Sequence, residues 1–235
     1  MKEYITSQIR NVALASHSSS GKTMMAEAFL HFTGATTRLG KIEDGTTVSD
    51  YDEEEIRRGI SLASTVIPIE YKNLKINILD TPGYTDFVGD VISAMSVADS
   101  AIILVDSVSG LEVGTEIALQ YAAEFKLPQM LVVNKMEREN ANFKKAMDSI
   151  QEHIDTRLIP IQLPWGEKAD FKGVIDLLTL KAYKGDGKVA SEIPAEFLDE
   201  VNSNRTALVE AAAEGDDTLL EKYFENGDLS NEEVV

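Results

Sequence analysis

The run SHSSSGKT at residues 16–23 combines the residue types that bind phosphate. It follows a short apolar segment at residues 11–15 and precedes a predicted helix over residues 23–32. This strand–loop–helix context is typical of a phosphate-binding loop. Backbone N–H groups in the loop and at the helix N-terminus offer partial positive charge to anionic oxygens. The predicted phosphate-binding residues are Ser18, Ser19, Ser20, Gly21, Lys22 and Thr23.

Two side chains of this loop have distinct expected roles. Lys22 would reach the outer phosphates, and the Thr23 hydroxyl would bind Mg²⁺. Ser16 stands where the motif usually begins with glycine. An alternative interpretation is a turn of small residues followed by a lysine that lies along the surface.

A second motif, DTPG, occupies residues 80–83 after the apolar segment 74–79. A carboxylate at the end of a strand beside a phosphate loop is suited to hold Mg²⁺ through water, so we expect Asp80 to serve the metal. Gly83 has no side chain to block the approach of its backbone N–H to a terminal phosphate. The alternative is a strand that simply closes in a Pro-Gly turn.

The third motif is Asn134-Lys135-Met136-Glu137, which follows the apolar segment 130–133. Asn-Lys-x-Asp at this place binds guanine, whose ring N–H and exocyclic amine donate to the carboxylate. Glu137 is one methylene longer than aspartate, and charge-assisted hydrogen bonds remain possible from it. A solvated polar strand exit is the alternative interpretation. The order of the three motifs, each after a predicted strand, favours nucleotide binding.

Predicted strands and helices alternate through the first part of the chain. This pattern indicates an α/β fold with a mostly parallel sheet and helices on both faces, with ligands bound at the carboxyl ends of the strands. The predicted strands cover residues 11–15, 62–70, 74–79, 101–106 and 129–133, and the helices cover 23–32, 86–97, 113–125 and 143–153. Residues 33–61 are predicted to form a long, polar loop with a helical turn.

The pattern changes near residue 158. Short strands are expected within residues 159–183, one long helix over 194–214 and another helix that begins after Asp216 or Asp217. We therefore expect a core over residues 1–157 and an inserted α+β subdomain over 158–235. Residues 185–235 contain 14 acidic and 3 basic residues, so this region carries −11 of the net charge of −18. Such a face is either simply solvated or binds a basic protein partner.

Composition excludes several classes of function. The chain has no cysteine, which rules out disulfides and thiolate metal sites and favours a cytoplasmic location. No apolar run approaches the ~20 residues of a membrane span, so no membrane association is expected. The net charge of −18 argues against binding to a nucleic-acid backbone, and direct sequence-specific DNA binding is not expected. The three histidines are scattered and predict no metal site.

The C-terminal residues contain a capping-box pattern, Ser230-Asn231-Glu232-Glu233, which indicates the start of a helix. Too few residues follow for a stable isolated helix, and the alternative is a frayed tail. We therefore expect the sequence to be part of a longer protein.

Taken together, the motifs resemble the GTPase domain of elongation factor G, and they are more similar to that of the elongation-factor-G-like paralogues of bacteria than to that of the housekeeping factor. Further segments that match this family are GTTVSDY at 45–51, RRGIS at 57–61, QLPWG at 162–166 and GVIDLL at 173–178. The resemblance implies the P-loop NTPase fold with an inserted subdomain, GTP and GDP as ligands, Mg²⁺ as cofactor and the ribosome as partner. It also implies a final base-recognition loop and a last core strand, and neither is found in this sequence.

The resemblance also assigns roles to individual residues. Ser61 stands where the family has a threonine that binds Mg²⁺, and it keeps the hydroxyl. Tyr84 stands at the position of the catalytic histidine, where a phenol is a poor base but can still hydrogen-bond a water molecule. Packing is the alternative role for Tyr84. Ser19 replaces the usual aspartate of the phosphate loop.

The expected function is Mg²⁺-dependent GTP hydrolysis by a translation-factor-like module, slow unless the ribosome stimulates it. The expected catalytic residues are Tyr84, Lys22 and Gly83, and the expected metal ligands are Thr23, Ser61 and Asp80. Two alternatives remain open. The module could sense GTP or GDP without hydrolysis, or it could be an ATP-using enzyme such as a kinase.

Overall fold

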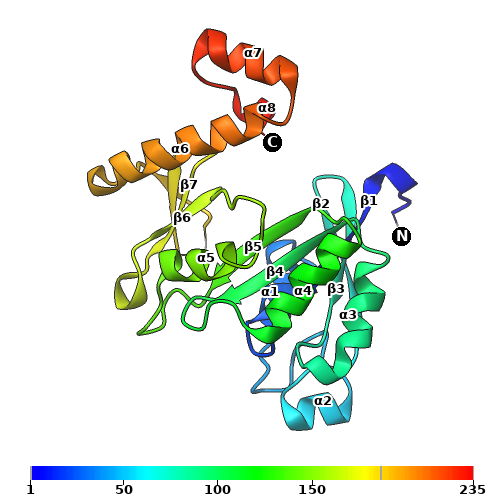
Figure 1. The fold of residues 1–235 in the computed structure, drawn as a ribbon. Helices are drawn as coiled ribbons and strands as arrows, with labels where there is room; N and C mark the ends of the chain where they lie inside the picture. Colours follow the sequence, from blue (N-terminus) through cyan, green and yellow to red (C-terminus); the bar gives the residue numbers. More distant parts are fainter. Residues whose placement is uncertain (1, 186, 235) are drawn as a thin grey trace. The chain divides into compact units, whose positions relative to one another are not determined.

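The computed structural model describes residues 2–185 and 187–234, which form two compact units, Met1–Lys135 and Met136–Val235 (Figure 1). The division falls earlier than the expected boundary between residues 157 and 158, because the helix after residue 142 groups with the second unit rather than with the sheet of the first. The boundary of the expected insertion itself stays a prediction.

The first unit is built on a five-stranded sheet with the order β2-β3-β1-β4-β5. Strands β3, β1, β4 and β5 run parallel, and β2 pairs antiparallel with β3 at the edge. The strands are β1 (Ile9–Ala15), β2 (Thr65–Tyr71), β3 (Leu74–Asp80), β4 (Ser100–Asp106) and β5 (Gln129–Asn134).

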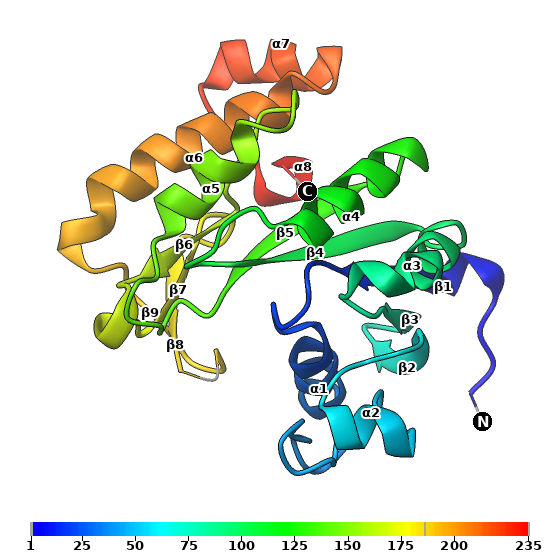
Figure 2. The ribbon, with the colours of Figure 1, turned by 60° about the horizontal axis from the view of Figure 1, so that its bottom comes forward.

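Helices cover both faces of this sheet. Helix α1 (Lys22–Phe32) packs on one face, where Leu14, Ala26, Leu30, Ile67, Ile69 and Ile78 form a buried apolar cluster. Helices α3 (Val88–Met95) and α4 (Val113–Glu124) lie on the opposite face (Figure 2). The predicted α/β architecture with a mostly parallel sheet is confirmed.

The strand register gathers the three motifs at one edge of the sheet. Leu14 pairs with Asp80, and Asp106 pairs with Asn134. Because these strands are parallel, the loops that follow them leave the sheet side by side. The carboxyl edge therefore brings together the phosphate loop, the segment after Asp80 and the segment after Asn134.

Strand β2 forms the outer edge of the sheet in this unit. Its side chains alternate, with Ile67 and Ile69 buried and Val66, Pro68 and Glu70 exposed. Proline lacks a backbone N–H and is tolerated in a strand where that position faces outward at an edge. The position of β2 in the sheet is thus compatible with its sequence.

The loop between α1 and β2 is held by carboxylates that water barely reaches. Glu27 of α1 is 1% exposed and accepts the backbone N–H of Gly40 at 2.8 Å and of Val48 at 2.6 Å. A buried charge is tolerated when hydrogen bonds compensate for the lost water. Glu27 therefore anchors two distant points of the loop to α1.

The helical turn predicted in this loop is α2 (Glu53–Arg58). Asp52 caps its N-terminus through the Glu54 N–H, and Gly59 ends it in the left-handed conformation. The buried Glu55 carboxylate accepts the N–H groups of Leu62 and Ala63. The predicted start of a strand at residue 62 is therefore wrong, since these two N–H groups are bound to a side chain and β2 begins at Thr65.

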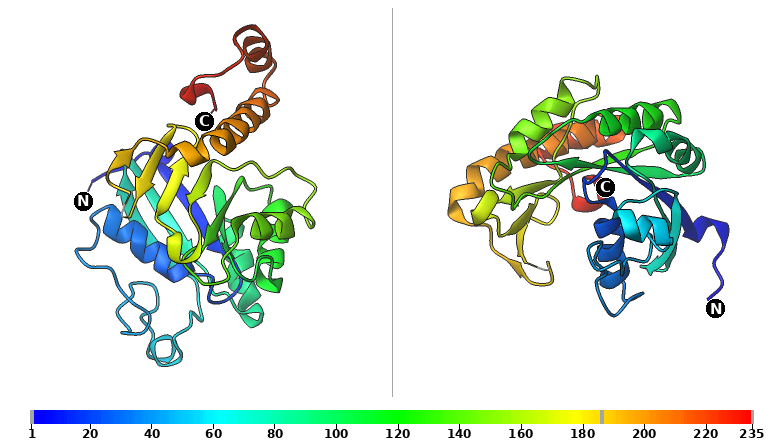
Figure 3. Two further views of the ribbon diagram at one scale, coloured as in Figure 1. Left: turned by 90° about the vertical axis from the view of Figure 1, so that its left-hand side faces the viewer. Right: turned by 90° about the horizontal axis from the view of Figure 1, so that it is seen from below.

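The second unit is an α+β structure. Its antiparallel sheet has the order β6-β7-β8-β9, with the strands visible side by side in Figure 3. Helix α6 packs on this sheet through Val201 and Leu208, which join Leu163, Ile175 and Ala182 in one buried cluster. The elements are α5 (Phe143–Gln151), β6 (Gln162–Trp165), β7 (Gly173–Asp176), β8 (Lys181–Lys184), β9 (Ala190–Ser191), α6 (Leu198–Ala213), α7 (Asp217–Asn226) and α8 (Asn231–Val234).

Local signals position the helices of this unit. Residues 195–197 form a 3₁₀ turn, so α6 starts at Leu198 rather than near residue 194 as predicted. Of the two predicted capping candidates, Asp216 caps α7 by accepting from the N–H groups of Thr218 and Leu219, and Asp217 is the first residue of the helix. The Glu233 carboxylate accepts from the Ser230 N–H at 2.9 Å, which confirms the capping pattern before α8.

No helix among the described residues is long and apolar enough to cross a bilayer.

Candidate functional site

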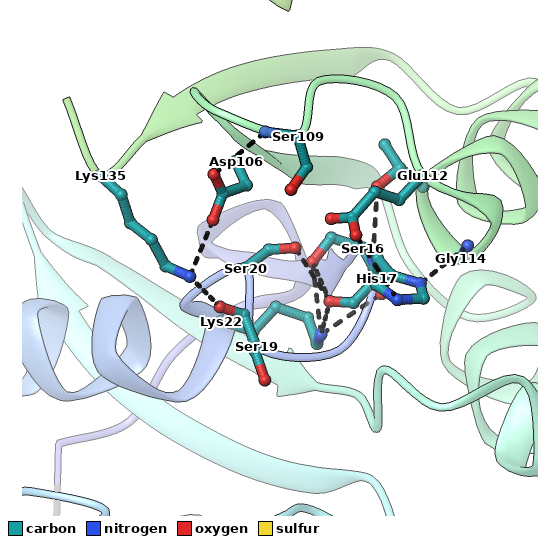
Figure 4. Close-up of polar contacts among 11 residues, drawn as sticks. Ser16, His17, Ser19, Ser20, Lys22, Asp106, Ser109, Glu112, Gly114 and Lys135 are labelled. Atoms are coloured by element: carbon teal, nitrogen blue, oxygen red, sulfur yellow. Dashed lines mark hydrogen bonds and ion pairs between the residues drawn. The ribbon is translucent and has the colours of Figure 1, made fainter. Parts of the chain in front are cut away.

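The phosphate loop wraps around the ammonium group of its own lysine (Figure 4). Lys22 is 6% exposed, and its Nζ donates to the carbonyl oxygen of His17 at 3.0 Å and to the carbonyl and hydroxyl oxygens of Ser16 at 3.3 Å. Burial lowers the pKa of Lys22 to about 8, although nearby Asp80 and Asp50 favour its charged form. The cation thus lies inside the loop, where an anionic ligand would meet it.

The backbone of the loop depends on conformations that few residues adopt. Ser19 has φ 60° and Gly21 has φ 106°. A Cβ at Gly21 would collide with the Asn134 side-chain amide, so glycine is required on steric grounds as well. The Asn134 amide donates to the Ser20 carbonyl at 2.9 Å, which ties the loop to the end of β5.

A cluster of oxygen atoms surrounds the N-terminus of α1. The Thr23 hydroxyl donates to Asp80 Oδ2 at 3.0 Å and lies 3.3 Å from the Ser61 hydroxyl. Ser61 in turn donates to Asp50 Oδ1 at 2.7 Å. The structure therefore brings together the three expected metal ligands Thr23, Ser61 and Asp80, and it adds Asp50.

The chemistry of this cluster fits a magnesium ion. Hydroxyl and carboxylate oxygens are the donors that Mg²⁺ prefers. Asp80 is 1% exposed, and among the described residues its Oδ1 and the Ser49 hydroxyl are buried without a hydrogen bond of good geometry. Burial raises the pKa of Asp80 to about 6, although the nearby Ser49 hydroxyl, Lys22 and the Thr23 hydroxyl favour its ionised form. A cation or its bound water would satisfy the unpaired oxygen.

Gly83 lies against the phosphate loop. A Cβ at this position would come within 2.5 Å of Lys22 Nζ and 2.7 Å of the Ser18 nitrogen. The backbone at Gly83 therefore reaches the loop only because this residue has no side chain. The next residue, Tyr84, is 41% exposed and lines a small cleft together with Ser16 and Gly114.

Two residues of the predicted base-recognition motif, Asn134 and Lys135, lie in the first unit. Lys135 Nζ donates to the Ser19 carbonyl and pairs with Asp106 Oδ2 at 2.9 Å (Figure 4). Asn134 and Lys135 therefore both contact the phosphate loop, at Ser20 and Ser19. Glu137 belongs to the second unit and is exposed, so its role in base recognition stays a prediction.

Contacts made by three residues of the site, His17, Asp106 and Asp50, were not predicted from the sequence. His17 Nδ1 accepts the Gly114 N–H at 3.2 Å, and the His17 N–H donates to Thr115 at 3.3 Å, so the loop also rests on α4. Asp106 and Asp50 each hold a predicted site residue, Lys135 and Ser61. Asp106 could have been predicted as a site residue from the sequence, because it is a carboxylate at the end of a predicted strand, as Asp80 is. Asp50 lies in an acidic run with no feature that separates it from its neighbours.

Comparison with known proteins identifies the family of this fold and site. The family model of the elongation factor Tu GTP binding domain matches residues 7–230. A crystal structure of a protein from Thermus thermophilus is similar to this chain, with 35% sequence identity and a TM-score of 0.89. The match covers 97% of this chain and 34% of that protein, so the chain spans about a third of the relative's length. The chain therefore belongs to the family of elongation factor Tu GTP-binding domains, the translation-factor GTPases.

Proposed function

We propose that this chain is the guanine-nucleotide-binding domain of an elongation factor G-like translation factor, and that it hydrolyses GTP to GDP and phosphate. One observation carries the proposal. Asn134 and Lys135, from the motif typical of guanine binding, hydrogen-bond directly to the phosphate loop at Ser20 and Ser19. A base and a polyphosphate would thus be held by one connected set of residues.

The loop and its lysine would bind the phosphates. The backbone N–H groups of residues 18–23 and the N-terminus of α1 offer partial positive charge to phosphate oxygens. Lys22 would exchange its contacts with the Ser16 and His17 carbonyls for phosphate oxygens. Thr23, Ser61 and Asp80 would hold Mg²⁺, with Asp50 behind Ser61. The ion supplies neutralisation of charge on the outer phosphates.

Hydrolysis would depend on positioning rather than on a strong base. The Gly83 N–H would donate to the terminal phosphate, since the backbone at this residue reaches the phosphate loop. Tyr84 would orient the attacking water through its phenol. A phenol is a poor base near neutral pH, so we expect slow intrinsic turnover. Contact with the ribosome would supply the missing acceleration.

The remaining expectations concern partners and location. The ribosome would be the partner of the longer protein, since this family consists of translation factors. A basic protein partner for the acidic residues 185–235 and a cytoplasmic location remain predictions from composition, as do the absence of membrane association and of direct sequence-specific DNA binding.

Calorimetric titration of the chain with GDP and GTP in the presence of Mg²⁺ tests the proposal. We expect binding that Lys22→Ala abolishes, because the loop then loses the cation that faces the phosphates. Lys75→Ala serves as the matched control. Lys75 is near the first residue of β3, whereas Asp80 is the last residue of this strand. If neither nucleotide binds at millimolar concentration, the proposed function is wrong.

A single-turnover assay with ribosomes separates hydrolysis from nucleotide sensing. We expect ribosomes to accelerate cleavage of bound GTP and Tyr84→His to raise the intrinsic rate, because an imidazole is a better proton acceptor near neutral pH. Retention of intact GTP with ribosomes present would favour the sensing module. Tighter binding of ATP than of GTP would favour the kinase-like alternative.

A further inference from the structure

Lys135 is held in a backbone conformation that it would not adopt alone. Its φ is 62°, in the left-handed region that costs a residue other than glycine about 1 kcal/mol or more. The Ser107 hydroxyl donates to the Lys135 carbonyl at 2.8 Å, and the Ser107 N–H donates to the Asn134 carbonyl at 3.0 Å. The segment after β4 therefore fixes the backbone at the end of β5.

The Asp106 carboxylate is itself rigidly placed. It is 4% exposed, and its Oδ1 accepts the N–H of Val108 at 2.9 Å and of Ser109 at 3.4 Å. Its Oδ2 lies 2.9 Å from Lys135 Nζ. Burial opposes ionisation, but the Val108 N–H and the Lys135 ammonium together hold the pKa of Asp106 below its usual value. Lys135 Nζ thus lies against a carboxylate whose ionised form these contacts favour.

The ammonium of Lys135 has a second partner, the Ser19 carbonyl in the phosphate loop. Ser19 is the other non-glycine residue of this site with a left-handed backbone, at φ 60°. One cation therefore bridges two strained backbone segments, and Asp106 determines where that cation lies (Figure 4). A lysine with four rotatable bonds would otherwise sample many positions.

We propose that Asp106 is a positioning residue for guanine-nucleotide binding, which acts by holding the Lys135 ammonium against the phosphate loop at Ser19. The inference rests on the proposed function and adds to it a specific residue outside the three motifs. Asp106 itself need not touch the nucleotide. Its effect on affinity should pass through Lys135, and this dependence separates a positioning role from general support of the fold.

The first test is Asp106→Asn in the full chain, with GDP binding measured in the presence of Mg²⁺. The amide keeps the size of the side chain and can still accept the Val108 N–H, but it loses the charge that attracts Lys135. We expect GDP affinity to fall about tenfold or more, the range associated with loss of a hydrogen bond between charged groups. The dissociation rate of GDP should rise correspondingly, because the ammonium is no longer fixed.

Asp99→Asn is the matched control. Asp99 directly precedes β4, and its carboxylate also accepts a backbone N–H: Oδ2 accepts the Asn11 N–H at 2.7 Å, near the end of β1 that lies away from the phosphate loop. Its loss should lower the unfolding temperature without changing GDP affinity. If Asp99→Asn weakens GDP binding as much as Asp106→Asn does, the effect is general destabilisation and the inference is wrong.

A double-mutant cycle with Lys135→Met gives a readout that a purely structural role would not produce. In the Lys135→Met background Asp106 is left as a buried charge without its ammonium partner, so adding Asp106→Asn should raise the unfolding temperature. GDP affinity should then change little beyond the effect of Lys135→Met alone. If Asp106 only supported the turn at Val108, its substitution would lower the unfolding temperature in both backgrounds.

The outcomes also separate this inference from the function on which it rests. If the unaltered chain binds no guanine nucleotide, both fail. If it binds GDP and Asp106→Asn binds equally well, only the role of Asp106 is refuted.

Discussion

Asp80 keeps a carboxylate where water barely reaches it, and this should weaken the fold in the absence of ligand. The side chain is 1% exposed, and burial raises the pKa of Asp80 from 3.8 to about 6. Asp80→Asn removes the charge and retains an oxygen that can accept the Thr23 hydroxyl. We therefore predict that this variant is more stable than the native protein when nucleotide and Mg²⁺ are absent.

The magnitude follows from the shift in pKa. The pKa of Asp80 is higher in the folded than in the unfolded state. Its contribution to the free energy of unfolding is therefore fully present below the pKa of the unfolded state and is lost as the pH rises through the pKa of the folded state. The shift from 3.8 to about 6 corresponds to about 3 kcal/mol of lost unfolding free energy above pH 6. Asp80→Asn should recover up to this amount at about pH 8 and only about 0.5 kcal/mol at about pH 4.

Urea unfolding with EDTA at the two pH values measures this difference. Asp86→Asn removes an exposed carboxylate from the following segment and should change stability by no more than about 0.5 kcal/mol at either pH. Calorimetry should also show weaker binding of the Mg²⁺–nucleotide complex by Asp80→Asn. A variant less stable than the native protein at about pH 8 would refute the account of Asp80 as a buried carboxylate that destabilises the fold.

Three further predictions concern the rest of the chain. Glu27→Gln should speed limited proteolysis within residues 33–52, because the loop loses two charge-assisted bonds to α1. Ile67→Ala should cost roughly 2–5 kcal/mol in urea unfolding, since this side chain is 1% exposed in the core beneath α1. Hydrogen bonds from Lys222 and Ser230 lower the pKa of Glu233 from 4.5 to about 2. The stabilisation that the Glu233 carboxylate gives to the α8 cap is therefore present above pH 4.5 and is lost as the pH falls toward 2. An NMR titration of its carboxyl carbon should therefore show a midpoint well below 4.5, and Lys222→Met should raise it.

The sequence predicted those parts of the site that depend on strand order. Leu14 and Asp80 are register partners, as are Asp106 and Asn134, and alternating strands and helices are enough to place their following loops at one edge. The elements themselves agree to within a few residues, because apolar runs and capping residues such as Asp216 are local signals.

Long-range side-chain contacts could not be predicted in this way. Glu27 looks like any polar residue of a helix, yet it is buried because backbone N–H groups from residues 40 and 48 return to it. Glu55 similarly binds the N–H groups that would otherwise begin a strand at Leu62. Such contacts depend on where the chain goes after leaving an element, and no local pattern records that path.

Strand β2 affects how the molecule behaves at high concentration. A free strand edge invites pairing with another copy and growth into aggregates. Pro68 interrupts the row of donors along this edge, and Glu70 would place like charges near each other if two such edges met. Together with a net charge of −18, these features should oppose self-association through β2 and keep the molecules separate in crowded solution.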